Sequence, residues 1–396
     1  MEQRCLLVAG LACWFLLAAV TAQATDHGKY LVYIGTYTEH GSKGIYVCEF
    51  DSATGQLGSP KLAAETPQPS FLAVSADRKF LYAVNEANTF AGQPGGGVSA
   101  YAINPTTGQL HLLNAVSSRG GGPAHIMLDK TGRYVLVANY DGGSVAVFRL
   151  QGDGKVGEST AFVQHQGSSV NRERQEAPHA HAVAMSPDNR FAIVADLGLD
   201  QLLVYPFDVT QGTLGVAQVV KTEAGAGPRH LVFTASGKFL YVVNELSSSV
   251  TAYSWDAASG VMAAVQTIST GPSGPRNTAG EILFDPDGKF LYVSNRGVEN
   301  SIAVFRVDAG SGRMTRIDSV PTKGQTPRNF AIDPSGQWLI VGNQDSKSLY
   351  TFKVDRKSGR LKQSGPPLEI DSPAMVDFVQ RPTVFGPIID EGLHKK

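Results

Sequence analysis

The chain has 396 residues, 42% of them hydrophobic and 17% charged, with a formal net charge of −1. This composition is typical of a globular protein, and the near-neutral charge gives no electrostatic basis for binding nucleic acid or an anionic membrane. The 43 glycines and 21 prolines indicate a structure rich in tight turns.

The first 24 residues predict an export signal. Arg4 precedes an apolar stretch from Cys5 to Val20, and Ala22-Gln23-Ala24 is typical of a cleavage site. A transmembrane anchor is the alternative, but the stretch is shorter than the roughly 20 residues that a span needs. We therefore expect residues 1–24 to be a signal peptide and the mature protein to be periplasmic or secreted, without further membrane contact.

Cleavage of the signal would leave Cys48 as the mature chain's cysteine. A single cysteine cannot form an internal disulfide, so we expect the exported protein to be stable through packing. Cys48 lies in the apolar run IYVCEF, which predicts a buried side chain in a β-strand rather than a nucleophile.

After the signal, a related segment recurs seven times. Each copy opens with Lys, Arg or Gln, then an aromatic anchor and a short apolar run, as in KFLYVVNEL from Lys238. The anchors are 48 to 57 residues apart, and a period near 50 filled with short apolar runs and turns predicts one β unit copied around an axis. The anchors are Tyr30, Phe80, Tyr134, Phe191, Phe239, Phe290 and Trp338.

One copy, residues 227–268, contains four strand-like runs: LVFT, FLYVVN, SSSVTAYSW and VMAAVQTI. The turns ASGK and DAASG separate them, each with a glycine where positive φ is needed. Four strands per unit is the pattern of a propeller blade, and the 3.6-residue periodicity of a helical repeat is missing. The sequence therefore predicts an all-β, seven-bladed β-propeller with four-stranded blades, one domain spanning residues 25–381.

The two ends of the repeat array predict how the ring closes. The first copy starts at its second strand, without an innermost strand before it, whereas Ser372–Gln380 has the innermost-strand pattern and nothing after it to pair with. We expect this C-terminal strand to complete the first blade, which removes the free edges. Residues 382–396 are then a C-terminal tail.

Two sets of positions should converge at one end of the ring, because innermost strands begin and second strands end on the same side when they pair antiparallel. Innermost strands begin with Ser70, Ala124, His181, Arg229, Gly280 and Arg328, followed by Phe71, His125, Ala182, His230, Glu281 and Asn329. Second strands end with Thr36, Glu86, Tyr140, Leu197, Glu245, Arg296 and Gln344.

These positions hold charged residues at the ends of apolar strands, which packing alone would not require. We interpret them as a functional site at the mouth of the axis; the alternative is that some form ion pairs that tie blades together. The residue before each second-strand end recurs in nearly every blade and is predicted to be structural, bonding to the backbone. That column is Gly35, Asn85, Asn139, Asp196, Asn244, Asn295 and Asn343.

The segment Gln166–His181 is the longest insertion between blades. It is polar, contains Arg172 and Arg174, and leads into His181, so it is predicted to act as a lid or substrate collar. His179 and His181 lie on one side of an extended chain, which makes a metal site conceivable. No carboxylate or cysteine follows at a matching spacing, so we expect neither a metal nor a cofactor.

The chain resembles the bacterial 6-phosphogluconolactonase lactonase family, which also includes a fungal 3-carboxy-cis,cis-muconate cyclase. The resemblance rests on SVNRERQEAPHAHAVAMSPDNRFAIVADLG, GPRHLVFTASGKFLYVVNEL, FLYVSNRGVENSIAVF and TPRNFAIDPSGQWLIVGNQDS. It extends from Tyr30 to about Gln380 and implies a seven-bladed propeller, in agreement with the repeat count.

The resemblance also implies a catalytic set. The His of P-H-A-H is His181, the Arg of G-P-R-H is Arg229, the Glu of N-E-L is Glu245, and the Arg of S-N-R-G is Arg296. All four already stand in the converging positions. The export signal is a departure, since the phosphorylated lactone belongs to cytosolic sugar metabolism, and this leaves the substrate open.

We therefore expect a lactonase that hydrolyses a sugar lactone, either gluconolactone or its 6-phosphate. In this mechanism His181 or Glu245 is the general base, and the arginines stabilise the oxyanion and hold an anionic group. Two alternatives stay open: a lactonising cyclase acting on an unsaturated diacid, and a secreted binding propeller without activity. We expect a monomer. The candidate substrate-binding residues are His125, His230, Arg328, Gln344, Glu86 and Arg174.

Overall fold

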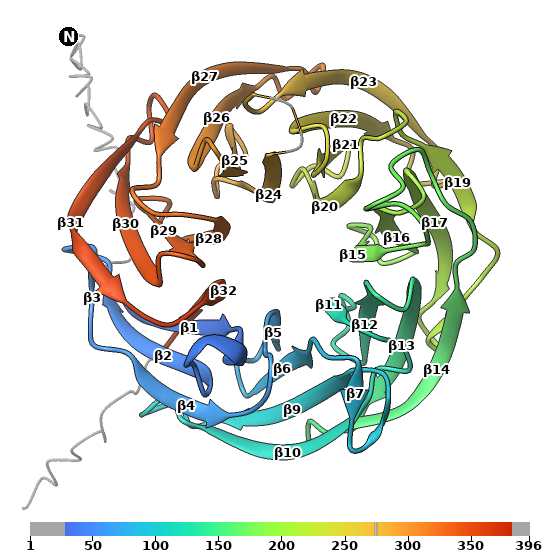
Figure 1. The fold of residues 1–396 in the computed structure, drawn as a ribbon, viewed down its shortest axis with the longest axis horizontal. Coiled ribbons are helices and arrows are strands. Elements are labelled where there is room, and N and C mark those ends of the chain that lie inside the picture. Colours follow the sequence, from blue (N-terminus) through green and yellow to red (C-terminus); the bar gives the residue numbers. More distant parts are fainter. Residues whose placement is uncertain (1–27, 273, 275, 382–396) are drawn as a thin grey trace, which may run out of the picture.

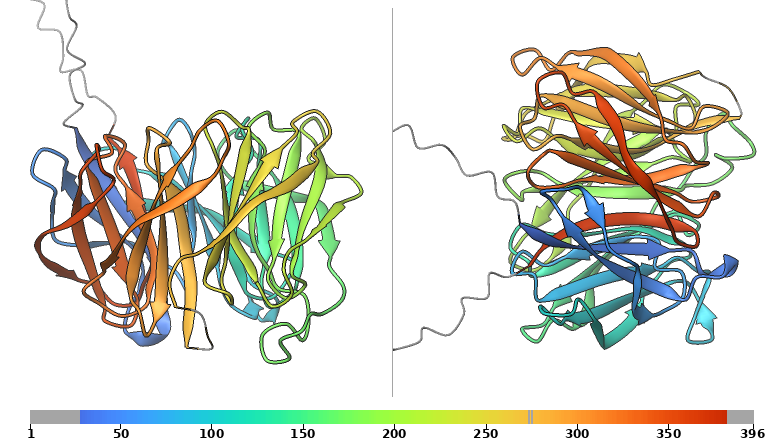
Figure 2. Two further views of the ribbon diagram at one scale, coloured as in Figure 1. Left: turned by 90° about the horizontal axis from the view of Figure 1, so that it is seen from above. Right: turned by 90° about the vertical axis from the view of Figure 1, so that its left-hand side faces the viewer.

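The computed structural model describes residues 28–381 except 273 and 275. Seven antiparallel sheets stand around an axis (Figure 1), and neighbouring blades pack side by side between the two ends of the ring (Figure 2). The predicted seven-bladed propeller is confirmed. The predicted signal peptide and tail lie outside the described residues. Within the described ranges, none of the helical segments has the length and apolar character needed to cross a membrane.

The first four blades follow one another around the ring. Blade one contains β1 (Lys29–Thr36), β2 (Gly44–Asp51), β3 (Gln56–Leu57), β4 (Lys61–Glu65) and β32 (Pro373–Gln380). Blade two contains β5 (Leu72–Val74), β6 (Phe80–Asn85), β9 (Gly97–Ile103) and β10 (Leu110–Ser117). Blade three contains β11 (Pro123–Leu128), β12 (Tyr134–Asn139), β13 (Ser144–Leu150) and β14 (Val156–Gln164). Blade four contains β15 (Ala180–Met185), β16 (Phe191–Asp196), β17 (Gln201–Asp208), β18 (Thr213–Leu214) and β19 (Gln218–Lys221).

The last three blades are regular. Blade five contains β20 (Pro228–Phe233), β21 (Phe239–Asn244), β22 (Ser249–Trp255) and β23 (Met262–Ser269). Blade six contains β24 (Asn277–Phe284), β25 (Phe290–Gly297), β26 (Ser301–Val307) and β27 (Met314–Pro321). Blade seven contains β28 (Pro327–Ile332), β29 (Trp338–Asn343), β30 (Ser348–Val354) and β31 (Leu361–Glu369). A ribbon of β7 (Thr89–Phe90) and β8 (Gln93–Pro94) extends blade two, and a short 3-10 helix η1 (Thr38–His40) follows β1.

The ring closes as the sequence predicts. β32 pairs antiparallel with β1, so the last strand of the chain becomes the innermost strand of blade one (Figure 1). This pairing protects the edge of β1. Trp338 of blade seven adds a second link, because its Nε1 donates a hydrogen bond to the Ser52 carbonyl oxygen of blade one at 2.8 Å.

Each blade packs its anchor side chain onto a glycine in an outer hairpin of the next blade. At Gly55, φ is +74° and an added Cβ would lie 2.4 Å from the Trp338 ring, so both the backbone conformation and the contact require glycine. This contact explains why the aromatic anchor and the turn glycine recur together. The pairs are Leu31–Gly108, Phe80–Gly154, Tyr134–Gly212, Phe191–Gly260, Phe239–Gly312, Phe290–Gly359 and Trp338–Gly55.

Blade one corrects the predicted alignment by one residue. Its anchor is Leu31 rather than Tyr30, and its second strand ends one position later than predicted. The Tyr37 amide donates to the Ser372 carbonyl at 3.0 Å, as the Glu245 amide donates to the Gly227 carbonyl at 2.7 Å. Tyr37, not Thr36, therefore occupies the axial position in blade one.

The recurring asparagine column is structural, as predicted. Asn295 Nδ2 donates to the Thr270 carbonyl at 3.0 Å, and Asn343 Nδ2 donates to the Thr322 carbonyl at 3.3 Å. These bonds fasten the second strands of blades six and seven to the end of the preceding blade, whereas Asn244 Nδ2 donates to Ser249 Oγ and Thr251 Oγ1 within blade five. Cys48 is 1% exposed and unpaired, and burial raises the pKa of its thiol to about 12, which agrees with a packing role.

Candidate active site at one end of the axis

The innermost strands carry a register irregularity where they begin. The pairing skips the first axial residue, so these residues leave the regular ladder, and a bulge of this kind re-aims side chains. Because of this irregularity, the side chains of His181, Arg229 and Arg328 do not follow the regular alternation between the two faces of the sheet. The shifts fall between Ala180 and Ala182, Pro228 and Leu231, Ala279 and Ile282, and Pro327 and Asn329.

Glu245, directly after β21, is the centre of the cluster. Its Oε2 accepts a hydrogen bond from Arg229 Nε at 3.0 Å and lies 2.9 Å from Arg296 Nη2. Its Oε1 accepts from Arg174 Nη2 at 2.7 Å. His181 Nε2 is 4.0 Å from Oε2. Three guanidinium groups from different parts of the chain therefore converge on one carboxylate that is 4% exposed.

The charges of this cluster stabilise one another. Burial alone would raise the pKa of Glu245, but Arg296, Arg229 and Arg174 outweigh it and hold that pKa well below its ordinary value of 4.5. Burial and the neighbouring Arg296 lower the pKa of Arg229. For Arg174 burial acts in the same direction, but Glu245 overcomes it and raises the pKa. Glu245 is therefore a fixed anion whose oxygens are occupied by guanidinium donors.

A second group of polar residues adjoins the first, on blades one, two and seven. Glu86 accepts hydrogen bonds from Tyr37 Oη at 2.8 Å and from Ser70 Oγ. Arg328 Nη2 lies 3.9 Å from Glu86 Oε1, and its guanidinium carbon is 4.9 Å from the centre of the Tyr37 ring. Arg328 is thus held by one long ion pair and one cation–π contact, which leaves donors available to a ligand.

A layer of rings lies against the charged residues. The His230 ring is 5.1 Å from that of His181 and 5.4 Å from that of His125, centre to centre. Phe71 is 4.3 Å from His125 and 5.6 Å from His230. His230 Nδ1 lies 3.0 Å from Glu281 Oε1. Residues from blades two to six therefore meet across the axis.

The three axial histidines have different electrostatic surroundings. Burial, then Arg229, lower the pKa of His181 well below 6.5, and burial with His230 does the same for His125. Burial also lowers the pKa of His230, but Glu281 opposes the shift. At neutral pH the imidazoles are uncharged, so each offers one donor and one acceptor nitrogen.

The structure brings together nine of the ten candidate residues, and each contacts at least one other member through the bonds, ion pairs or ring contacts above. They are His181, Glu245, Arg229, Arg296, His125, His230, Arg328, Glu86 and Arg174. Gln344 follows β29 at the same end, but within the described residues its Oε1 is buried without a hydrogen-bond partner, and it shares no bond with the other nine.

The insertion before blade four supplies Arg174, as the collar hypothesis requires. Arg174 Nη2 also lies 3.2 Å from Tyr140 Oη, and Gln175 Nε2 donates to the Leu197 carbonyl at 2.8 Å, which fastens the loop to blade four. Arg172, two residues earlier, is exposed.

Sequence reasoning missed Tyr37 because of the alignment error in blade one.

His179 and His181 do not share a ligand position. His179 stacks on Tyr140 with ring centres 4.5 Å apart, and its Nδ1 lies 3.0 Å from the Tyr140 carbonyl oxygen. Across residues 28–381, the described side chains include no group of three or more histidines, cysteines or carboxylates placed to hold a metal ion.

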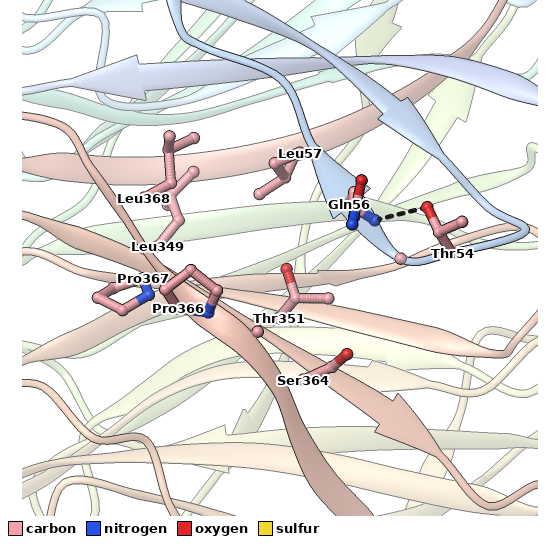
Figure 3. A pocket seen from close by; sticks show the side chains of 11 residues that line it. Thr54, Gln56, Leu57, Leu349, Thr351, Ser364, Pro366, Pro367 and Leu368 are labelled. Carbon is pink, nitrogen blue, oxygen red and sulfur yellow. Dashed lines mark hydrogen bonds between the residues drawn. The ribbon is translucent and has the colours of Figure 1, made fainter.

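A pocket of about 410 Å³ lies elsewhere, between the outer strands of blades one and seven (Figure 3). Leu57, Leu349 and Leu368 line it together with Pro366 and Pro367. Its lining residues carry no charge, so this pocket lacks the acid–base and anion-binding groups found at the axis.

The fold and the site together define a seven-bladed β-propeller with a buried cluster of arginines, histidines and carboxylates at one end of its axis. Residues 31–378 match the family described as "Lactonase, 7-bladed beta-propeller", and the chain belongs to that family. This family membership, together with the relatives described next, confirms the predicted enzyme class, a lactonase.

Individual relatives cover almost the whole ring. A 6-phosphogluconolactonase of Bacillus subtilis is 36% identical over 355 residues, which is 89% of this chain and 99% of the relative. A 6-phosphogluconolactonase of Formosa agariphila is 35% identical over 84% of this chain and 94% of its own length. The solved structure of the periplasmic gluconolactonase PpgL of Pseudomonas aeruginosa superposes with a TM-score of 0.84 at 35% identity, covering 89% of this chain and 100% of that one.

Proposed function

We propose that this protein hydrolyses a sugar lactone, gluconolactone or its 6-phosphate, at the axial cluster. The observation that carries the proposal is the convergence of Arg229, Arg296 and Arg174 on Glu245 beside the neutral imidazole of His181. Opening a lactone requires a base for the attacking water and cations for the oxyanion, and the cluster offers both. Relatives named 6-phosphogluconolactonase and gluconolactonase support this substrate class.

His181 is the better candidate for the general base. Each oxygen of Glu245 already accepts from a guanidinium group, and the lowered pKa of Glu245 makes it a weak proton acceptor. His181 is neutral at physiological pH, because burial and the arginines disfavour its charged form. In this mechanism Nε2 takes a proton from water as the water oxygen bonds to the acyl carbon. The same nitrogen then returns the proton to the departing ring alkoxide.

The arginines stabilise negative charge as it develops. Arg229 and Arg296 are held rigidly by Glu245 and by the carbonyls of Gly280 and Ala279, at 2.9 and 3.0 Å. Such preorganised donors favour an oxyanion without having to reorganise during the reaction. Arg328 and Arg174 are more exposed and would hold a carboxylate or phosphate group. His125, Glu86 and Gln344 would contact the sugar hydroxyls.

We also propose that the protein acts outside the cytoplasm. The support is the signal-like sequence of residues 1–24 and the similarity to a periplasmic gluconolactonase. In that compartment the unphosphorylated lactone would be the more accessible of the two substrates.

The proposal is tested by measuring acid release from glucono-δ-lactone and from its 6-phosphate, with spontaneous hydrolysis subtracted. Carboxymuconate serves as a third substrate. Arg229→Ala should lower kcat/KM by about 10²–10³, the usual effect of removing an oxyanion donor. Arg313→Ala, an exposed arginine in a blade-six turn, is the control. Equal rates for the parent and Arg229→Ala on both sugar lactones would refute the proposal, and turnover of carboxymuconate alone would favour the cyclase alternative.

A further inference from the structure

The ring layer contains a carboxylate–imidazole pair that the mechanism above leaves unused. Glu281 Oε1 lies 3.0 Å from His230 Nδ1 and accepts from the Ile282 amide at 2.9 Å. Asn329 Nδ2 donates to the other oxygen, and the Glu281 amide donates to Ser294 Oγ at 2.9 Å. Glu281 is 5% exposed. Three groups therefore hold the carboxylate, a fourth contact holds the Glu281 backbone, and the fixed carboxylate orients the His230 ring.

This contact determines the tautomer of His230. An ionised carboxylate can only accept hydrogen bonds, so Nδ1 carries the proton and Nε2 is left as an acceptor. Glu281 is ionised, since the hydrogen bond from His230 and the charge of Arg229 overcome the effect of burial and lower its pKa. Within the described residues, Nε2 of His230 is buried without a hydrogen-bond partner. A buried acceptor of this kind is costly unless it has a function or a partner during turnover.

His181 has an unpartnered ring nitrogen of the complementary kind. Its Nε2 lies on the Glu245 side, 4.0 Å from Oε2, whereas its Nδ1 is buried and also has no partner among the described residues. The His181 and His230 rings meet edge to face, 5.1 Å apart at 73°. Catalytic hydrogen bonds are often long in unliganded enzymes and shorten in the substrate complex. Ring centres 5.1 Å apart are compatible with a hydrogen bond between ring nitrogens once the two rings turn towards each other in the substrate complex.

We propose that His181, His230 and Glu281 form a proton relay in which Glu281 is the positioning residue, a proposal that rests on the lactonase function above. His181 Nε2 takes the proton of the attacking water, and the Nδ1 proton of His181 passes to His230 Nε2. Glu281 stabilises the resulting His230 imidazolium. When the acyl–oxygen bond breaks, the transfers reverse and the ring alkoxide leaves with a proton, so water is divided between the acid and the alcohol without any other reactant.

The charges around the two rings favour this direction of transfer. Arg229, Arg328 and Arg296 face His181 and oppose a positive charge there, with Glu245 as the nearest anion at 4.0 Å. Arg229 and Arg328 also face His230, together with the neutral His125 ring, but His230 has Glu281 in direct contact. A proton arriving on His181 is therefore stabilised by moving to His230. The relay explains how a base surrounded by arginines can accept a proton.

The test compares pH profiles of kcat for the parent and Glu281→Gln with glucono-δ-lactone. The amide keeps the shape of the side chain but removes its charge, so the plateau should fall by roughly 10- to 100-fold and the acid limb should move to lower pH. KM should change little. In a His181→Gln background the same substitution should cost nothing further, because residues that act as one unit are not additive.

The control is Asp333→Asn, which removes a buried carboxylate that accepts from the Trp338 amide at the opposite end of blade seven. It should lower stability without moving the acid limb. For the parent, nitrogen-15 NMR of labelled histidines should show the Nδ1–H tautomer for His230, a measurement that does not require Glu281→Gln to fold.

An unshifted acid limb in folded Glu281→Gln, additivity with His181→Gln, or the Nε2–H tautomer for His230 would each overturn the relay while leaving lactone hydrolysis in place. A parent protein that opens no lactone above the spontaneous rate would instead remove the proposed function itself.

Discussion

Arg229 lies in β20 and Glu245 directly follows the neighbouring strand β21 of blade five, and the 3.0 Å contact between Nε and Oε2 fixes both at the axis. Arg296 reaches the same oxygen from blade six, so this second pair also links neighbouring blades. The ion pair that links blades five and six therefore uses the same atoms as the proposed active site.

The collar arginine should affect substrate binding more than chemistry. Arg174 has 40% of its side chain exposed and bonds to Glu245 Oε1, so a bound anion can reach its remaining donors. We expect Arg174→Gln to raise KM for a phosphorylated or carboxylated lactone by roughly tenfold, with a smaller effect on kcat. Steady-state kinetics on glucono-δ-lactone and its 6-phosphate measure the difference.

Arg172 provides the matched control for this prediction. It lies in the same loop, carries the same charge and is exposed. Arg172→Gln should leave KM for both lactones unchanged. Equal increases of KM for the two variants would indicate that the net charge of the loop, rather than the contact of Arg174 with the site, determines binding.

Replacing Glu245 by Gln should destabilise the ring strongly at neutral pH. The variant leaves buried arginines without their anion, a change that typically costs about 3–5 kcal/mol. Because the folded state holds the pKa of Glu245 below 4.5, its contribution is complete above pH 4.5 and is lost as the pH falls through the folded pKa. The stability difference between parent and variant should therefore shrink in acid, as measured by urea unfolding.

An exposed ion pair serves as the comparison for Glu245. Glu49 lies 2.7 Å from Arg381 on the outer surface and is 59% exposed at its side chain. Glu49→Gln should cost less than about 1 kcal/mol at any pH, because solvent screens such pairs. A similar loss for Glu49→Gln and Glu245→Gln would mean that the axial cluster carries no special share of the stability.

The closure of the ring depends on Trp338. Trp338→Ala removes the ring that packs on Gly55 and the hydrogen bond to the Ser52 carbonyl, so we expect a loss of about 3–5 kcal/mol and a lower Tm. Trp338→Phe keeps the packing and should cost about 1 kcal/mol for the hydrogen bond alone. Calorimetry distinguishes the two, and equal losses would mean that the hydrogen bond, not the packing, secures the junction.

The sequence was sufficient to predict the ring, because each blade repeats the same local signals. The anchor side chain of one blade packs on the turn glycine of the next, as Phe239 packs on Gly312. The spacing of these residues in the sequence therefore reflects the packing between blades. Blade one broke the pattern. In this blade the chain begins at the second strand, and the aromatic residue Tyr30 directly precedes the true anchor, Leu31. The alignment based on aromatic residues was therefore wrong by one position.

The site was only partly predictable for a physical reason. Counting positions identifies which residues reach the axis, such as Glu245 and Glu281, but not which atoms meet there. That both oxygens of Glu245 are occupied by arginines depends on side-chain geometry across several blades and on a loop, and no spacing rule encodes it. The same holds for the pairing of Glu281 with His230, which joins blades five and six.

Asp377 supplies a pH-dependent prediction away from the charged cluster. It lies in β32 opposite Tyr33, at a register position that the other innermost strands fill with apolar residues. Those residues are Ala73, Met127, Ala184, Val232, Leu283 and Ala331. Asp377 is partly buried, and the loss of solvation at this position raises the pKa of its carboxyl group to about 7.

A carboxyl group with a raised folded pKa stabilises the fold only while it is protonated. Between its ordinary pKa of 3.8 and the folded value of about 7, the native state binds the extra proton, so stability falls as the pH rises through this window. Asp377→Asn should therefore be more stable than the parent by roughly 1–3 kcal/mol at pH 8, and the gain should vanish near pH 4. Unfolding curves across this range measure it. A variant that is less stable than the parent at pH 8 would show instead that the ionised carboxylate has a favourable partner within the ring.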